Sequence, residues 1–286
     1  MFFSRKEPEK IVLFILALSS VLIVLFIVGF MLKESFPVFS IWKEFFTGMQ
    51  WNPSMGEFGI VPILISTFFV GGGAVLISAL IGIPAAIYLA EYSPKKLRNV
   101  LKPSINMLVG IPSVVLGFFG LMIIVPFIRD SFGSNGESML AGWIILAIMT
   151  LPHVISMSED AIRAVPKKYK EASLSLGASK WQTIKRVILP NAKSGIFASL
   201  ALGIGTAIGE TMAVLMVIGN PNVPWIPDSI LEPVRVLTST IVIEIPYSVW
   251  GSMHQHALFG MGIVLFFVVA IFNVGIKKAI NKKNKK

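Results

Sequence analysis

The chain has 286 residues, of which 55% are hydrophobic and only 14% are charged. Soluble domains carry about 25% charged residues, so this composition excludes an ordinary soluble enzyme, a disordered chain and a coiled coil. It indicates an all-α polytopic membrane protein. The absence of Cys excludes disulfides, thiolate metal sites and a Cys nucleophile. The net charge of +10 would also suit a nucleic-acid-binding protein, so the positions of the basic residues have to decide.

Six apolar stretches are long enough to cross a bilayer core as helices, which takes about 20 residues. In chain order they are Ile11–Leu32, Ile60–Ala90, Ile105–Ile128, Met139–Met157, Ser194–Gly219 and Val249–Ile276. We expect residues 1–58 to form an N-terminal transmembrane helix with an external loop, and residues 59–286 to form the core transmembrane domain. The aromatic residues of that external loop are typical of a membrane–water interface; they are Trp42, Phe45, Phe46 and Trp51.

Basic residues gather in every second loop, and this asymmetry predicts the orientation. Of the 25 Lys and Arg residues, the alternate loops hold only Lys33, Lys43, Arg129 and Arg235. Cytoplasmic loops carry the excess of Lys and Arg, so we expect both termini in the cytoplasm. The positive charge is then a topology signal and an attraction to anionic membrane lipid, and no nucleic-acid partner is expected.

The longest of the basic loops, about residues 159–193, has the pattern of two short helices joined by a turn. The run Glu171-Ala172-Ser173-Leu174 favours a helix, and Gly177 permits a turn with positive φ. A second helix can follow over Ala178–Val187, and Pro190 is expected to end it. Such a loop would offer a compact knob to a partner protein, or it is only a solvated amphipathic connector.

This loop resembles the EAA loop of ABC importer permeases, in which Glu-Ala-Ala is followed by a Gly six residues after the Glu and then by Ile-x-Leu-Pro. Ser173 stands in place of the third Ala and Val187 in place of the Ile. The resemblance implies a type I ABC importer permease fold, in which this loop docks into a cytoplasmic ATPase. The residues then expected to couple to the ATPase are Glu171, Ala172, Ser173, Gly177, Ala178, Leu189 and Pro190.

Other segments narrow the resemblance to the phosphate importer permeases, and to their PstC-type subunit in particular. They are Gly-Ile-Pro-Ser-Val-Val-Leu-Gly-Phe at 110–118, Ile-Gly-Glu-Thr-Met-Ala-Val at 208–214, Leu-Ala-Glu-Tyr at 89–92 and Arg-Val-Leu-Thr-Ser-Thr at 235–240. The resemblance implies a plasma-membrane permease for inorganic phosphate. Its expected partners are a PstA-type second permease, a dimer of PstB-type ATPase subunits and an extracellular PstS-type phosphate-binding protein.

Glu210 lies inside the fifth apolar stretch, where an ionisable group is costly and is by default a candidate functional residue. The family often has an Arg four residues earlier, but Thr206 stands there, so Glu210 needs another partner or stays protonated. We expect Glu210 and Thr206 to act in translocation or gating.

The hydroxyl groups of Ser113 and Thr211 supply partial positive charge without a trapping cation, so we expect them to line the pathway; ordinary helix–helix polar contacts are the alternative. Two arginines of the external loops, Arg129 and Arg235, are candidates for contact with the binding protein or its anion. Solvated surface charge is the alternative for both.

Several kinds of chemistry have no motif in this sequence. No G-x-x-x-x-G-K-[ST] loop is present, so ATP hydrolysis by that route requires a separate subunit. His254 and His256 are two residues apart and fall on different faces of a helix, with no acidic residue beside them, so no metal site is expected. No catalytic residue and no cofactor are predicted. The alternatives are a permease for another oxyanion, such as molybdate, tungstate or sulfate, and an ATP-independent carrier that uses Glu210 as a proton site.

Overall fold

A computed structural model describes residues 8–283, and the described part of the chain is mostly helical. The long helices are α1 (Pro8–Ser35), α3 (Val61–Ile87), α7 (Met139–Arg163), α10 (Leu189–Gly209) and α13 (Met253–Lys283). The shorter α-helices are α2 (Trp42–Thr47), α4 (Lys95–Met107), α5 (Ser113–Phe119), α6 (Val125–Phe132), α8 (Lys167–Ser175), α9 (Lys180–Thr183), α11 (Met212–Val217) and α12 (Leu237–Glu244). A two-stranded antiparallel hairpin pairs β1 (Trp51–Asn52) with β2 (Glu57–Phe58).

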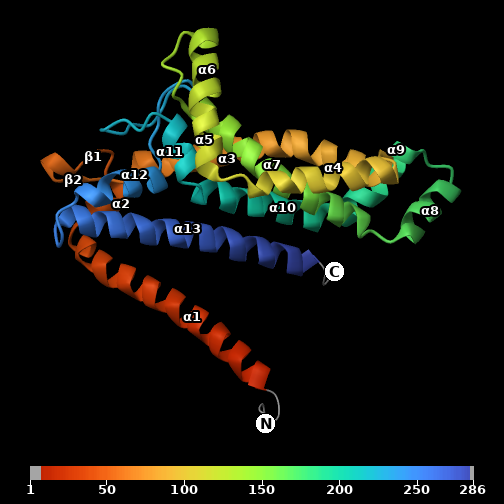
Figure 1. The fold of residues 1–286 in the computed structure, drawn as a ribbon, viewed down its shortest axis with the longest axis horizontal. Helices are drawn as coiled ribbons and strands as arrows, with labels where there is room; N and C mark the ends of the chain where they lie inside the picture. Colours follow the sequence, from red (N-terminus) through yellow and green to blue (C-terminus); the bar gives the residue numbers. More distant parts are fainter. Residues whose placement is uncertain (1–7, 284–286) are drawn as a thin grey trace.

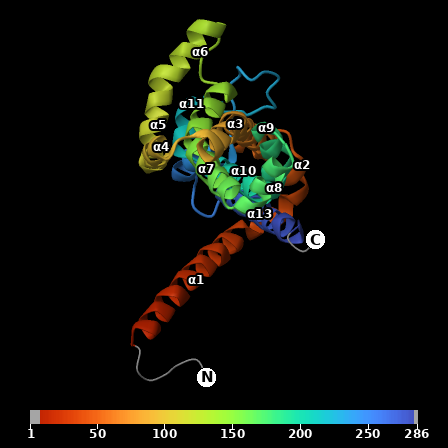
Figure 2. The ribbon, with the colours of Figure 1, turned by 90° about the vertical axis from the view of Figure 1, so that its right-hand side faces the viewer.

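Six helical segments of the described chain are long and apolar enough to cross a membrane, which confirms the predicted number. Helices α3, α7 and α10 run side by side, with α13 along one flank, while α1 diverges from α13 and α6 projects away from the bundle (Figure 1). Figure 2 shows α1 leaving the cluster of α3, α7, α10 and α13 from a second direction. The orientation prediction rests partly on basic residues at the two chain ends, and residues 1–7 and 284–286 lie outside the described part.

Small residues let the central helices approach closely. A Cβ atom added at Gly71 would lie 2.9 Å from the Ile208 side chain, and one at Gly82 would lie 2.9 Å from Val154. Such contacts join α3 to α10 and to α7. Lipid does not drive helices together by the hydrophobic effect, so close packing of this kind is a main source of association in a membrane.

The helix boundaries differ from the predicted ones at two prolines. The third apolar stretch is not one helix from Ile105: α4 ends at Met107, and Ile111 and Pro112 are extended before α5 starts at Ser113. Pro disfavours the α region for the residue before it, which explains the break. The prediction that Pro190 ends a helix is wrong, because Lys180–Gly209 is continuous. A π-helical stretch, Ile184–Ile188, ends two residues before Pro190 and accommodates its ring and missing N–H.

The fourth stretch also runs further than predicted, past Pro152 to Arg163, as α7. The fifth breaks at Glu210, where the backbone is extended, so that α10 ends at Gly209 and α11 begins at Met212. Both broken segments, α4–α5 and α10–α11, contain motif residues from the sequence analysis.

At the end of the bundle that carries the hairpin, aromatic residues form a small core. Phe45 and Trp51 are fully buried there, whereas Trp42 and Phe46 are exposed. The interfacial prediction is therefore wrong for Phe45 and Trp51, which pack with residues of α3, α12 and α13 in one cluster. We call this region, formed by α2, β1, β2 and α12, the hairpin end. The α8–α9 segment lies at the opposite end of the molecule (Figure 1).

Candidate functional site

The predicted knob is present as α8, a glycine turn and α9, and its local hydrogen bonds explain its shape. Gly177 has φ +80°; its N–H donates to the Leu174 carbonyl at 3.0 Å, and the Ala178 N–H donates to the Ser173 carbonyl at 3.2 Å. These two bonds form a Schellman motif, the common helix ending that places Gly in the left-handed region. We call residues 167–183 the knob.

The second helix of the knob starts with a capping box. The Gln182 N–H donates to Ser179 Oγ at 3.2 Å, and the Ser179 N–H donates to Gln182 Oε1 at 2.8 Å. The two helices are also joined directly, because the hydroxyl groups of Ser173 and Thr183 lie 2.9 Å apart. The residue that departs from the Glu-Ala-Ala pattern therefore links α8 to α9.

Apolar side chains of the knob point away from the chain. Leu176 is 89% exposed, Trp181 55% and Leu174 42%. Glu171 and Ala172 are exposed, and Ala178 is half-buried. Leu189 packs behind the knob against a buried cluster that includes Ile162 and Ile184, and Pro190 is exposed.

Two contacts attach the knob to the end of α3. Lys170 pairs with Glu91 of the π-helical stretch Tyr88–Tyr92, and Lys180 Nζ lies 4.0 Å from the centre of the Tyr92 ring. The Leu-Ala-Glu-Tyr segment at 89–92 thus supplies both partners.

Glu210 forms the break between α10 and α11. Its Oε1 accepts a hydrogen bond of 3.3 Å from the Ala213 N–H, so the carboxylate caps the first turn of α11, where negative charge is favoured. Its carbonyl accepts one of 3.2 Å from Thr238 Oγ1. Thr206 Oγ1 donates to the Leu202 carbonyl at 2.9 Å, within its own helix.

Ser113 and Thr211 lie at corresponding ends of two packed helices. A Cβ atom at Gly117 would lie 2.9 Å from Ala213 Cα, and one at Gly120 would lie 2.8 Å from Val217. Because the contacts advance together along both helices, α5 and α11 are parallel. Ser113 starts the first helix and Thr211 directly precedes the second, so both hydroxyl residues are at the N-terminal ends of this pair.

The two candidate external arginines differ. Arg129 is exposed, and its Nε donates to the Asn135 carbonyl at 3.1 Å. Arg235 is only 3% exposed, so it is not the solvated surface charge that was its alternative. Its Nη2 lies 2.7 Å from Glu244 Oε1, and its Nη1 donates to the carbonyls of Pro221 and Asn222 at 3.3 and 3.4 Å.

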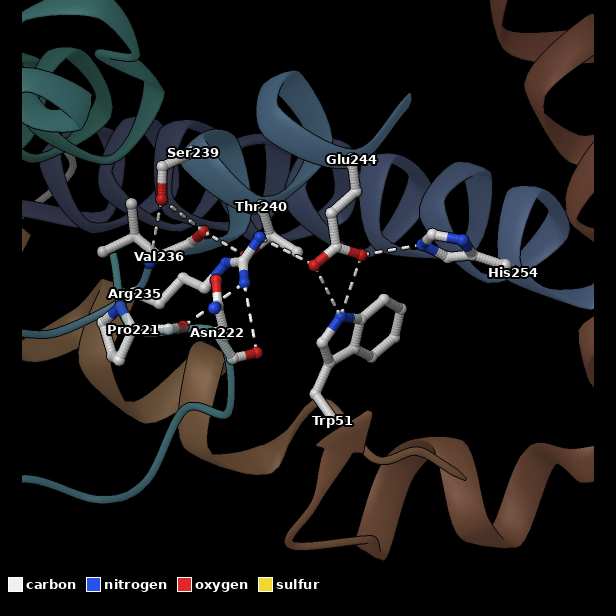
Figure 3. A network of polar contacts seen from close by, with 9 residues as sticks. All are labelled: Trp51, Pro221, Asn222, Arg235, Val236, Ser239, Thr240, Glu244 and His254. Carbon is white, nitrogen blue, oxygen red and sulfur yellow. Dashed lines mark hydrogen bonds and ion pairs between the residues drawn. The ribbon is translucent and has the colours of Figure 1, made fainter. Parts of the chain in front are cut away.

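Glu244 is the centre of this network, as Figure 3 shows. Trp51 Nε1 donates to both carboxylate oxygens, at 3.1 and 3.0 Å, and His254 Nε2 lies 2.7 Å from Oε2. Burial lowers the pKa of Arg235, and the Glu244 carboxylate opposes that shift. The network joins the hairpin, α12 and α13 at the hairpin end. The expectation that His254 has no acidic neighbour is wrong, because the fold brings Glu244 next to it.

A second ionic cluster that the sequence analysis missed joins α4 to α7. Lys102 pairs with both Glu159 and Asp160, and Arg163 Nη1 lies 3.2 Å from Glu159 Oε1. Glu159 is fully buried. A signal for this cluster was available in the sequence, since Glu159 is an acidic residue in a loop rich in Lys and Arg. A buried carboxylate requires a cation, and such a loop supplies one. Within residues 8–283, no group of three or more His, Asp or Glu could hold a metal ion.

The amino-acid sequence of the chain is similar to those of known transport proteins. Residues 82–285 match the family described as "Binding-protein-dependent transport system inner membrane component". The chain belongs to this family. It is therefore the membrane component of an ABC importer, a multi-pass permease of the plasma membrane, and this component is not the catalytic one.

Curated relatives of this permease carry related names. It is 40% identical over 232 residues to "Probable ABC transporter permease protein YqgH" of Bacillus subtilis, covering 80% of this chain and 74% of that protein. It is 32% identical over 245 residues to "Phosphate transport system permease protein PstC" of Mesorhizobium japonicum, covering 79% and 74%. The PstC protein of Haemophilus influenzae is 30% identical, with 84% and 81% covered. The predicted resemblance to PstC-type permeases is confirmed.

Solved structures support the type I importer permease fold. A chain of a bacterial ABC transporter that imports the acidic polysaccharide alginate aligns with a TM-score of 0.67 at 13% identity, covering 97% of this permease and 98% of that chain. A chain of the MetNI methionine ABC transporter, in an inward-facing conformation, aligns with a TM-score of 0.60 at 20% identity, covering 81% and 98%. At these identities the likeness concerns the fold alone.

Proposed function

We propose that this permease is one of two transmembrane subunits of an ATP-driven importer of inorganic phosphate. Its partners are a PstA-type permease, a dimer of PstB-type ATPase subunits and an extracellular PstS-type phosphate-binding protein. The knob transmits ATP-driven motion to the membrane helices, and both termini lie in the cytoplasm on the same side as the knob.

The exposed knob carries the coupling part of this proposal. Leu174, Leu176 and Trp181 would be poorly placed on a solvated connector, because they present large apolar surface to water. Docking into a groove of an ATPase buries that surface, with Glu171, Ala172 and Ala178 at the contact and Ser173 and Gly177 holding its shape. Leu189 and Pro190 then begin α10, which follows the knob after the π-helical stretch Ile184–Ile188.

The proposed pathway passes an anion through the membrane interior without a trapping charge. Ser113 and Thr211 lie at the starts of the parallel helices α5 and α11, and helix N-termini carry partial positive charge. Glu210 occupies the start of α11 with its own negative charge, so its role is gating: movement of the carboxylate away from the Ala213 N–H opens that helix end to phosphate. Thr206, one turn earlier on α10, accompanies that movement.

The substrate is proposed from the relatives, since the PstC proteins of two organisms carry phosphate transport in their names. Arg129, exposed at the end of α6, is assigned to contact with the binding protein. Arg235 acts there indirectly, by holding the 221–222 loop that would face the same partner.

The test is uptake of labelled phosphate into vesicles that contain the full four-component complex. ATP-dependent phosphate uptake that requires the binding protein is expected. Uptake that persists without the ATPase would support the ion-coupled carrier instead. Uptake of tungstate, molybdate or sulfate in place of phosphate would keep the coupling mechanism and overturn the substrate.

A further inference from the structure

A groove lies between α4 and the C-terminal end of α7, at the end of the molecule that carries the knob. It has a volume of about 710 Å³ and is broadly open at the surface. Arg98, Asn99, Lys102 and Asn106 line it from α4, and Arg163 lines it from α7. None of these residues belongs to the transport sites described above.

The charges in and around this groove do not balance. Lys102 is held by Glu159 and Asp160, and Arg163 by Glu159. Burial opposes the charged form of Lys102, but hydrogen bonds and attraction from Asp160 and Glu159 raise its pKa. Within residues 8–283, no salt bridge of Arg98 is found. Three cations therefore meet two carboxylates, and the excess positive charge sits on the groove wall at Arg98.

The donor groups in the groove suit one ligand class. Arg98 comes from α4 and Arg163 from α7, and a guanidinium presents five N–H donors in a planar fork that fits phosphate oxygens. The contact to Glu159 uses one of the donors of Arg163. The amide of Asn99, which is exposed on the same wall, adds further donors.

We propose that this groove binds a phosphate-bearing anion on the knob side of the permease. The ligand is inorganic phosphate leaving the transport path or the headgroup of an anionic phospholipid. The inference extends the proposed function, because a phosphate importer needs a site from which the anion departs.

The position of the groove links its occupancy to the knob. Arg163 ends α7, and α8 begins at Lys167, so a movement of the knob displaces one wall of the groove directly. Within residues 8–283, Arg98 on α4 has no salt bridge to α7, so its distance to Arg163 can change when the knob moves. An anion that bridges Arg98 and Arg163 would therefore bind more tightly in one knob position than in the other, which is the requirement for coupling.

The absence of Cys from the chain allows a direct test by single-cysteine labelling. The full-length Asn99→Cys permease, assembled with its partner subunits in phosphatidylcholine nanodiscs, is labelled with a maleimide at increasing inorganic phosphate and constant ionic strength. Ser104→Cys, on an exposed position of the same helix outside the groove, is the labelling control. Parallel samples replace part of the phosphatidylcholine with phosphatidylglycerol and contain no phosphate.

We expect phosphate to slow labelling at position 99 and to leave position 104 unchanged. Adding Arg98→Gln should raise the half-protecting phosphate concentration about tenfold or more, because a charge-assisted hydrogen bond is lost. Lys96→Gln removes an equal charge from α4 outside the groove and should change the half-protecting phosphate concentration less than twofold. Protection by phosphatidylglycerol that depends on Arg98 identifies the lipid headgroup as the source.

The groove proposal is overturned if neither phosphate nor phosphatidylglycerol protects position 99, or if Arg98→Gln leaves the protection intact. Its failure is distinguishable from failure of the proposed function. Phosphate uptake by the complex without Arg98-dependent protection would reject the groove alone. Lack of phosphate uptake together with Arg98-dependent protection by phosphatidylglycerol would reject phosphate as cargo and retain the groove.

Discussion

The turn at Gly177 gives a prediction whose magnitude follows from the structure. Gly177 has φ +80°, and a Cβ atom added there would meet nothing within 4 Å. Replacement by Ala therefore adds no clash and costs only the left-handed backbone, about 1–2 kcal/mol. Replacement by Asn, which tolerates this region better, should cost less. Pro fixes φ near −65° and removes the N–H that bonds to Leu174, so the cost should exceed about 3 kcal/mol.

If docking requires the turn, these free energies appear as weaker binding of the ATPase. For Gly177→Ala the affinity for the ATPase should fall by at most about 5- to 30-fold. For Gly177→Pro we expect no measurable complex. The assay is the binding of purified ATPase to the permease in nanodiscs, together with co-purification from membranes. Gly72→Ala is the matched control, because it makes the same chemical change in α3 without a positive φ and with nothing within 4 Å.

Membrane insertion should be unchanged in the Gly177 variants, because Gly177 lies outside the candidate membrane spans. The reasoning is refuted if Ala and Pro at position 177 bind the ATPase as the wild type does. It is equally refuted if Gly72→Ala weakens binding as much as Gly177→Ala.

Four other predictions concern single contacts. Ser173→Ala restores the family residue but removes the bond to Thr183, so ATPase affinity should fall by up to about tenfold; unchanged affinity would show that this bond is dispensable. Arg235→Met leaves Glu244 with only the Trp51 and His254 contacts and should lower stability by up to about 3–5 kcal/mol, measured as a lower Tm in detergent; an unchanged Tm contradicts the network. The pKa of Lys102 is raised above 10.5, so its stabilising contribution is complete below pH 10.5 and is lost as pH rises beyond the raised value; the Tm difference from Lys102→Met should shrink only there. Glu210→Gln keeps an oxygen for the cap of α11 but removes the charge, so phosphate uptake should fall while assembly stays normal; full uptake would make Glu210 a packing residue.

The parts of the fold that depend on local signals were predictable. Apolar length gave the six membrane helices, and Gly177 together with the Glu-Ala-Ser run gave the knob, because a Schellman ending needs only a few consecutive residues. The break at Glu210 also had a local signal, in the charge and the glycines around it. Pro112 carried a signal of the same kind, but the hydropathy of its surroundings concealed the break.

Contacts between distant segments could not be predicted in this way. Trp51 and Glu244 are 193 residues apart, and nothing near either residue indicates the other. Arg235 therefore looked like a surface charge, although its partner makes it a buried one. The prediction for Pro190 was wrong for a different reason. A π-helical stretch accommodates the ring and the missing N–H of the proline, and hydrogen bonding of that kind leaves no pattern in the residue types.

The attachment of the knob has a mechanical consequence. Peptide bonds join it to α7 before and α10 after, and the Lys170–Glu91 and Lys180–Tyr92 contacts clamp it to the end of α3. A force applied at Leu176 is therefore shared by three membrane helices that are already packed against one another. Helices α3 and α7 are continuous through the bundle, so the force reaches its far end through them, and the interruptions at Pro112 and Glu210 allow the α4–α5 and α10–α11 segments to bend.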